Sequence, residues 1–224
     1  MTGFELRDDS YGVGKVMLLH SSWKPEYERI FREKHIEALR LSYSLGFKDK
    51  DVCFVSLLGF LRSLEIYSWD VTSVDISNLT ELEVLGFEIQ CKKPVDFSRL
   101  KKLRVASLTW REGYKGVFEV NSLEELNIVN YPFEDLIPLN RLSRLRNLKI
   151  TSRKLASLNG ITSLKQLESL DLYNCPQLSS LSGAEKCSQR VEIEVEACRH
   201  ISRNIMKTHN KALQPTSPLA RRRV

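Results

Sequence analysis

The sequence lacks the features that would place a protein in a membrane or outside the cell. No apolar run approaches the roughly twenty residues that a membrane-spanning helix needs, and residues 1–9 lack the basic and then apolar layout of a secretory signal. The five cysteines are few and odd in number, and no two of them have the two- or four-residue spacing of a zinc site. These absences predict a cytoplasmic protein whose thiols are reduced.

Motifs that indicate catalysis are also missing. Residues 12–15, Gly-Val-Gly-Lys, lack the glycine spacing and the trailing Ser or Thr of a phosphate-binding loop, and predict a turn before a strand. No Gly-x-Ser-x-Gly motif occurs, and no cysteine stands in a catalytic signature. The histidines, none of which has a partner at metal-ligand spacing, are His20, His35, His200 and His209. We therefore expect no enzyme activity and neither a metal nor a cofactor.

Excess positive charge is absent from the body of the chain. The formal net charge is +6, yet residues 1–198 hold 27 basic and 28 acidic residues. The remaining basic residues, with no acidic residue among them, are Arg199, Arg203, Lys207, Lys211, Arg221, Arg222 and Arg223. A groove that follows a nucleic-acid backbone needs clustered positive charge, which the body does not have. Nucleic-acid association through the basic C-terminal tail is therefore kept only as the alternative function.

What the sequence does contain is a repeated unit, Leu-x-x-Leu-x-Leu. A clear copy is 167–172, and the most degenerate is 190–195. The third apolar position recurs at steps of 20 to 25 residues, at Leu41, Ile66, Phe87, Leu108, Ile128, Ile150, Leu172 and Val195. One such unit cannot bury its leucines without neighbours on both sides, so the pattern predicts a stacked solenoid.

These copies resemble the leucine-rich repeat family, whose unit is Leu-x-x-Leu-x-Leu-x-x-Asn/Cys-x-Leu in repeats of roughly 20–29 residues. Residues 167–178 carry the first three leucines and Cys175 at the defined positions, and the last leucine, Leu178, stands one position later. Between strands, apolar residues recur at every third position, as in 155–167, which suits a 3₁₀ return and is similar to internalin-like bacterial proteins. The resemblance implies an α/β solenoid with a parallel sheet on the concave face and a mostly 3₁₀ or irregular convex side.

Three segments are expected along the chain. Residues 1–35 predict an N-terminal β/α cap, 36–201 a leucine-rich repeat solenoid of about eight turns, and 202–224 a disordered basic tail. In the cap, 13–19 read as a strand before a helix that has Pro25 in its first turn. That helix should place three apolar side chains on one face, those of Tyr27, Ile30 and Phe31.

The tail also resembles peptides translated through the recombination site that borders mobile gene cassettes of bacterial integrons. This resemblance rests on the wording of residues 210–224, which hold two prolines and three consecutive arginines. It implies a bacterial origin and a basic tail that arose by accident rather than by selection.

The inward Asn/Cys position of the family is matched only at Cys175 and Cys198. The other copies hold Trp69, Gln90, Arg111, Tyr131 and Arg153 there. We assign three aromatic side chains to core packing, namely Trp69, Tyr131 and Phe133. An unpaired arginine cannot be buried, so local distortion or snorkelling is expected at Arg111 and Arg153.

Side chains that flank the inward leucines should point outward on the concave face. The candidate binding residues are Arg40, Tyr43, Glu65, Tyr67, Glu88, Thr109, Trp110, Asn127, Lys149, Asp171 and Tyr173. Tyr67 and Tyr173 favour protein recognition most, because an exposed ring on an open sheet is less expected by chance. The alternative is that these residues are polar only because a solvated sheet face must be. Glu192, Glu194 and Glu196 should share one face, where an acidic edge that limits further stacking is favoured over the alternative of binding a basic partner.

The expected function is therefore a non-catalytic protein–protein interaction module. An unidentified protein partner would bind on the concave face, with a regulatory or immunity-type role in a bacterium as one version. We expect a monomer that contacts no membrane, and the residues do not name the partner.

Overall fold

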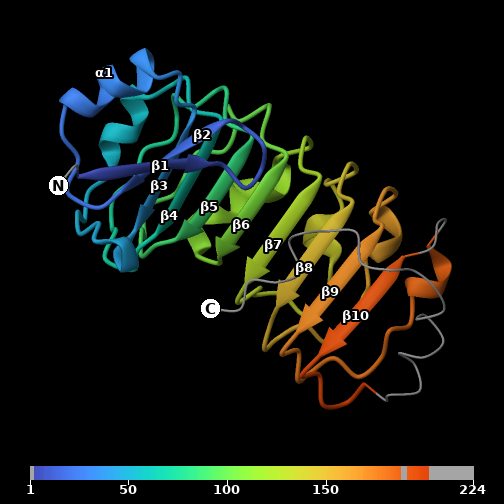
Figure 1. Cartoon of the computed structure of the whole chain (residues 1–224). Helices are drawn as coiled ribbons and strands as arrows, with labels where there is room; N and C mark the ends of the chain where they lie inside the picture. Colours follow the sequence, from blue (N-terminus) through green and yellow to red (C-terminus); the bar gives the residue numbers. More distant parts are fainter. Residues whose placement is uncertain (1–2, 188–190, 202–224) are drawn as a thin grey trace.

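The computed structural model describes residues 3–187 and 191–201. Within these ranges the strands form one ten-stranded sheet in which spatial order follows chain order from β1 to β10 (Figure 1). The strands are β1 (Phe4–Asp8), β2 (Lys15–Leu19), β3 (Ala38–Ser42), β4 (Ser63–Tyr67), β5 (Val84–Glu88), β6 (Val105–Thr109), β7 (Glu125–Val129), β8 (Asn147–Thr151), β9 (Ser169–Tyr173) and β10 (Glu192–Glu196). The β1–β2 pair is antiparallel, and all later pairs are parallel.

The expected solenoid is confirmed at the level of strands and returns. The third apolar position of each copy of the repeat lies in one of the strands from β3 to β10. The returns after β3, β6, β7, β8 and β9 contain 3₁₀ turns, as the period of three indicated, whereas those after β4 and β5 are irregular. The 3₁₀ turns are η1 (Tyr43–Leu45), η2 (Cys53–Leu57), η3 (Glu112–Glu119), η4 (Ile137–Leu139), η5 (Ile161–Ser163) and η6 (Ala184–Lys186). Apolar side chains from strands and returns make one continuous core along the stack.

The segment before β3 contains a strand, β1, that the sequence analysis did not predict. Besides the expected strand, here β2, and the expected helix α1 (Glu26–Glu33), it holds β1, which pairs with β2 as an edge hairpin. Tyr27 and Phe31 of α1 are buried, and Ile30 packs against the core. Phe4 of β1 meets Tyr27 edge-to-face at 5.6 Å between ring centroids, which ties the hairpin to the helix.

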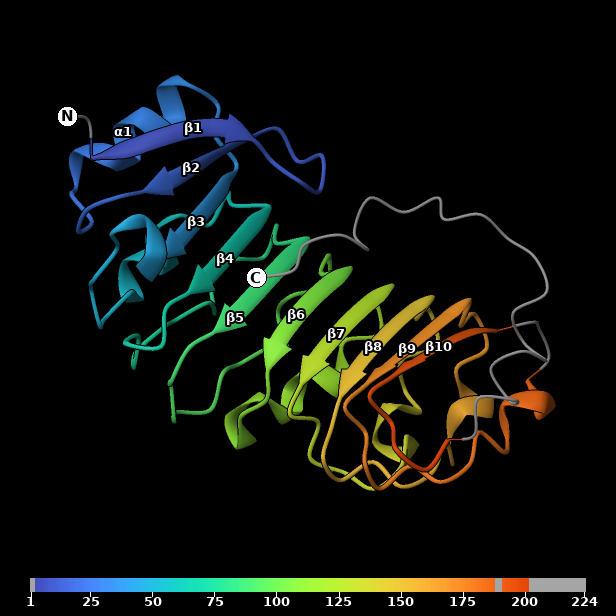
Figure 2. The same ribbon diagram turned by 60° about the horizontal axis from the view of Figure 1, so that its bottom comes forward.

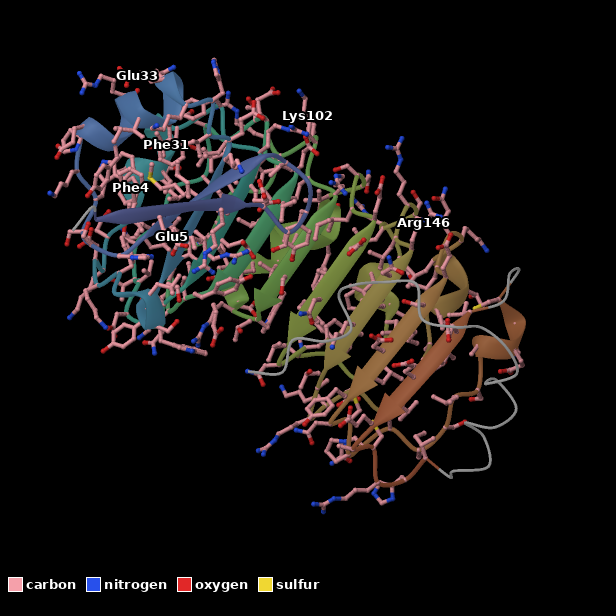
Figure 3. The ribbon with its side chains drawn as sticks, viewed as in Figure 1. Phe4, Glu5, Phe31, Glu33, Lys102 and Arg146 are labelled. Carbon is pink, nitrogen blue, oxygen red and sulfur yellow. The ribbon has the colours of Figure 1, made fainter. Side chains whose placement is uncertain are left out.

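One rim of the solenoid carries a ladder of alternating charge. The residue before each strand from β3 to β9 is, in order, Glu37, Arg62, Glu83, Arg104, Glu124, Arg146 and Glu168. Arg62 Nε donates to Glu83 at 2.6 Å, Arg104 Nε to the same carboxylate at 3.2 Å, and Arg146 to Glu168 at 2.6 Å. Arg146 lies on the same edge as Lys102 in Figure 3. Single exposed pairs stabilise little, but strict alternation opposes a slip of one repeat against its neighbours.

The predicted inward turn positions are only partly right. Tyr131 is buried and Phe133 is partly buried against the core, as expected. The prediction for Trp69 is wrong, because this side chain is 42% exposed and the preceding Ser68 is buried in its place. Arg153 is likewise exposed while Ser152 turns inward. Arg111 reaches out of the core and lies over the Trp69 ring at 5.2 Å.

Backbone conformation explains which residue turns inward. Asn130, Asn174 and Ala197 have left-handed backbones, and the next residue, Tyr131, Cys175 or Cys198, then takes the family's inward position. The turns after β4 and β8 have no left-handed residue, and there the serine one position earlier points inward. Ser152 Oγ donates to the Tyr131 carbonyl at 2.7 Å and accepts from the Leu155 amide at 3.0 Å. Ser152 thus supplies the backbone bonds expected of the Asn/Cys position, whereas Ser68 Oγ is buried without a hydrogen-bond partner.

Candidate functional site

The outward side chains of β2–β10 form three rows on the face turned away from the core, which we call the concave face. Strand register aligns the middle row as Leu18, Arg40, Glu65, Gly86, Ser107, Asn127, Lys149, Asp171 and Glu194. Burial divides this face in two. Its N-terminal half, β2–β5, is covered, whereas its C-terminal half, β8–β10, is open.

The turn of the β1–β2 hairpin covers the N-terminal half. Val13 of this turn packs on Val16, Leu18 and Ala38, which makes a second small core on the outward side of β2 and β3. The turn is held by Asp9, whose Oδ2 accepts from the Tyr11 amide at 2.7 Å. In Figure 2 the turn between β1 and β2 extends past the ends of these two strands, toward the side of the later strands. This half is therefore part of the folded interior.

Arg40, Glu65 and Tyr67 form a polar network under this cover. Arg40 donates through Nε at 2.6 Å and through Nη2 to Glu65 Oε2, and Tyr67 Oη donates to Glu65 Oε1 at 2.6 Å. Both carboxylate oxygens are therefore satisfied, although Glu65 is only 3% exposed. Burial, and then the Glu65 charge, raise the pKa of Tyr11 to about 12 and raise that of Tyr67 further. All four residues thus share one shielded environment.

Gly86 makes room for the Tyr67 ring. A Cβ at Gly86 would lie 2.9 Å from Tyr67 Oη and 3.2 Å from Glu65 Cγ. The missing side chain in the middle row therefore lets the tyrosine lie across β5 and reach the carboxylate beside it.

Two of the candidate binding residues do not lie on the open surface that the sequence analysis predicted for them. Glu65 and Tyr67 were expected on an open surface, but both belong to the covered network. Trp110 was also expected near this surface, and instead it stacks on Phe118 at 5.3 Å within an aromatic cluster against the core. Thr109 is 8% exposed and so offers little surface. The sequence gives the register of these residues but not what lies over them.

Two further candidates lie at the margin of the face. Tyr43 is 50% exposed but stands in η1, past the end of β3, with Lys48 Nζ over its ring at 2.9 Å from the centroid. Glu88 ends β5 and accepts from Trp69 Nε1 at 2.7 Å. Asn127 lies between the halves, where its amide donates to Ser107 Oγ at 3.1 Å while its carbonyl oxygen is buried without a hydrogen-bond partner.

The C-terminal half brings the remaining candidates together. Lys149, Asp171 and Tyr173 line a shallow hollow of about 350 Å³ with Glu194 and Glu196 of β10. Tyr173 is 44% exposed, as expected of a contact residue. The sequence analysis favoured a protective edge over a binding role for Glu194 and Glu196. The strand register that places them beside Asp171 and Tyr173 follows from the repeat.

The electrostatics of this hollow are those of crowded carboxylates with one cation. Burial raises the pKa of Asp171, and Glu192 raises it too, while Lys149 opposes them. Burial also raises the pKa of Glu194, followed by the charges of Asp171 and Glu192. The ionised forms are therefore less well stabilised here than in water, and an added positive charge would be favoured.

A second hollow, of about 600 Å³, lies beyond the ends of β7–β9. It is lined by Pro132, Phe133, Glu134, Arg153, Lys154, Ala156 and Gln177. Its lining residues belong to turns, so this hollow does not lie on the concave face. The sequence analysis did not predict it.

Two kinds of site are absent from the part of the chain that the structure describes. No group of three or more His, Cys, Asp or Glu there could hold a metal ion. No helix in that part is long and apolar enough to cross a membrane. The basic residues from Arg203 onward, on which the nucleic-acid alternative depends, lie outside the described residues.

Comparison with known proteins returns structures but no sequence family. No family model and no curated protein matches the chain. Internalin C2 of Listeria monocytogenes is similar at 23% identity and a TM-score of 0.44, and the match covers 71% of this chain and 61% of that one. An internalin (inlF) of the same organism matches at 18% identity and a TM-score of 0.31, over 75% and 73%. On its own repeats, strand register and 3₁₀ returns, the chain folds as a leucine-rich repeat solenoid.

Proposed function

We propose that the protein is a non-catalytic binding module whose partner protein docks on the open C-terminal half of the concave face. The observation that carries this proposal is the hollow in which the exposed Tyr173 stands among Lys149, Asp171, Glu194 and Glu196. An exposed ring gives large contact area at low entropic cost, and surrounding charges give specificity. Solenoids commonly present such extended concave surfaces to partners.

The charges specify the chemistry of the partner. The hollow holds three carboxylates and one ammonium, and burial, together with neighbouring carboxylates, raises the pKa values of Asp171 and Glu194. A partner segment with Arg or Lys beside an apolar or aromatic side chain would neutralise this charge and cover Tyr173. A regulatory or immunity-type role, in which binding alone alters the partner, is the version that we propose.

The test compares two exposed tyrosines in the full chain. Tyr173→Ala removes the ring from the hollow, and Tyr43→Ala removes an equally exposed ring outside it. Both variants and the parent chain are used for affinity capture from cells, with nuclease present, and the captured protein is then purified for titration. We expect at least a tenfold loss of affinity for Tyr173→Ala, about 1.4 kcal/mol, and no change for Tyr43→Ala.

Three results would overturn the proposal. They are equal binding by both variants, loss with Tyr43→Ala alone, and capture that depends wholly on nucleic acid. A further arm with Glu194→Gln in increasing salt tests the charge argument, because binding through opposite charges weakens as salt screens them.

A further inference from the structure

Cys175 and Cys198 occupy equivalent places in the last two turns of the solenoid. Each follows a left-handed residue, Asn174 with φ 51° and Ala197 with φ 58°. The pairing of Tyr173 with Glu196, two residues earlier in each turn, places the two cysteines on neighbouring levels of the stack. The Asn174 amide donates to the Glu196 carbonyl at 2.9 Å, so the register continues into the turn.

The sulfur of Cys198 lies directly against Cys175. It accepts from the Cys175 amide at 3.3 Å and lies 3.5 Å from the Glu196 carbonyl oxygen. The Cys175 thiol donates to the Tyr173 carbonyl at 3.5 Å. Neighbouring strands are about 4.8 Å apart, which falls within the range of about 4.4–6.8 Å between the Cα atoms of disulfide-linked cysteines. The spacing of the two turns is therefore compatible with a disulfide between these cysteines.

We propose that Cys175 and Cys198 are a thiol–disulfide site, at which a small-molecule disulfide such as oxidised glutathione converts the two thiols into an intramolecular disulfide joining β9 to β10. The other cysteines lack this arrangement: Cys53 contacts Ser73, Cys91 is buried near Lys93, and Cys187 follows η6. They serve as internal controls.

The reaction balances as two successive exchanges. The partly exposed Cys198, as thiolate, attacks one sulfur of the small disulfide, whose S–S bond breaks and releases one small thiolate. The Cys175 sulfur then loses its proton and attacks the Cys198 sulfur, which expels the second small thiolate. Two protein thiols are oxidised, one small disulfide is reduced to two thiols, and the two protons released by the cysteines protonate the leaving thiolates.

Burial assigns these roles to the two cysteines. Cys175 is fully buried, while Cys198 is partly exposed, so only the latter meets a dissolved oxidant. Burial, and then the neighbouring Cys198, raise the pKa of the Cys175 thiol. The second exchange is therefore the slow one, and its rate should rise about tenfold per pH unit near neutrality, because the thiolate is the nucleophile.

The disulfide would act on the last strand. β10 is the final strand of the described sheet and carries Glu194 and Glu196. A covalent link to β9 would hold this edge strand in place. The inference depends only on the two cysteines and their backbone, and it stands whether or not a partner binds the concave face.

In the experiment, the folded chain is incubated with oxidised glutathione. Free thiols are then trapped by alkylation, and the peptides are mapped by mass spectrometry without reduction. We expect one Cys175–Cys198 link, a mass lower by two hydrogens, reversal by dithiothreitol, and a higher Tm of the oxidised form. Cys187→Ser should leave the link intact, and Cys198→Ser should abolish it.

A second variant separates the two exchanges. Cys175→Ala removes the resolving thiol, so a glutathione adduct should accumulate on Cys198. A lasting adduct on Cys198 of the parent chain with Cys175 still free to alkylation, a link to any other cysteine, or no reaction at all would overturn the proposal.

Discussion

The two halves of the concave face have the same repeat architecture but different roles. Glu65 and Glu194 both occupy the middle outward row, yet Glu65 is 3% exposed within a hydrogen-bonded network while Glu194 is exposed at the edge of an open hollow. Tyr67 and Tyr173 differ in the same way one row over. A repeat position therefore specifies the direction of a side chain, whereas its role depends on whether another segment lies above it.

We expect the largest difference in the free energy of unfolding between the Glu65→Ala and Glu194→Ala variants. Glu65→Ala leaves the Arg40 guanidinium, whose side chain is 18% exposed, without its carboxylate, and should lower the free energy of unfolding by about 3 kcal/mol. Glu194→Ala should change it by less than about 0.5 kcal/mol. Urea denaturation of both variants measures the difference.

A double variant tests the cause of that loss. Arg40→Met with Glu65→Leu removes both charges and should regain most of the stability, since a buried pair replaced by apolar residues costs little. Equal losses in the single and double variants would contradict a buried charge as the cause.

Crowding at Gly86 should produce the next largest effect. The added Cβ of Gly86→Ala would meet Tyr67 Oη at 2.9 Å, so the ring must move away from Glu65, with a loss of about 1–3 kcal/mol. Lys149→Ala, in the same row of the open half, is the control and should lie within about 0.5 kcal/mol of the parent. If Gly86→Ala were as stable as the parent, Tyr67 would not be held by its network.

Removing single hydroxyl groups sharpens the comparison further. Tyr67→Phe loses the hydrogen bond to the Glu65 carboxylate and should cost about 1.5 kcal/mol. Tyr173→Phe, at the equivalent position in the open half, should be nearly neutral. Thermal denaturation of the pair gives the answer, and a similar Tm for both variants would argue against the covered network.

The smallest effect is the pH dependence of the open half. The raised pKa values of Asp171 and Glu194 mean that their contribution to stability is present when both are protonated and is lost as pH rises through the folded-state pKa values. Asp171→Asn with Glu194→Gln should therefore match the parent in acid and exceed it at pH 7 by less than about 0.5 kcal/mol. A variant less stable than the parent at pH 7 would show that pairing with Lys149 dominates.

Much of the fold was predictable, because the repeat is local. The leucine spacing placed an inward residue in each strand from β3 to β10, and the period of three anticipated the 3₁₀ returns. The site was less predictable. Lys149, Asp171 and Tyr173 are together as the rows imply, but Trp110 turned into an aromatic cluster and Trp69 turned outward. The residue that turns inward after a strand depends on whether a left-handed backbone residue precedes it, and the turn that holds Trp69 has none; the repeat pattern does not encode this difference.

The sequence by itself determined which side chains share a row, since strand register in a solenoid follows from a repeated hydrophobic spacing. Only the tertiary structure decided which part of each row meets solvent. The β1–β2 hairpin brings Val13 onto the outward face of β3 and Tyr11 close to Glu65, although β3 and Glu65 lie far from the hairpin turn in the chain. That contact depends on how an edge hairpin packs over the face of a sheet, and no periodic pattern carries this information.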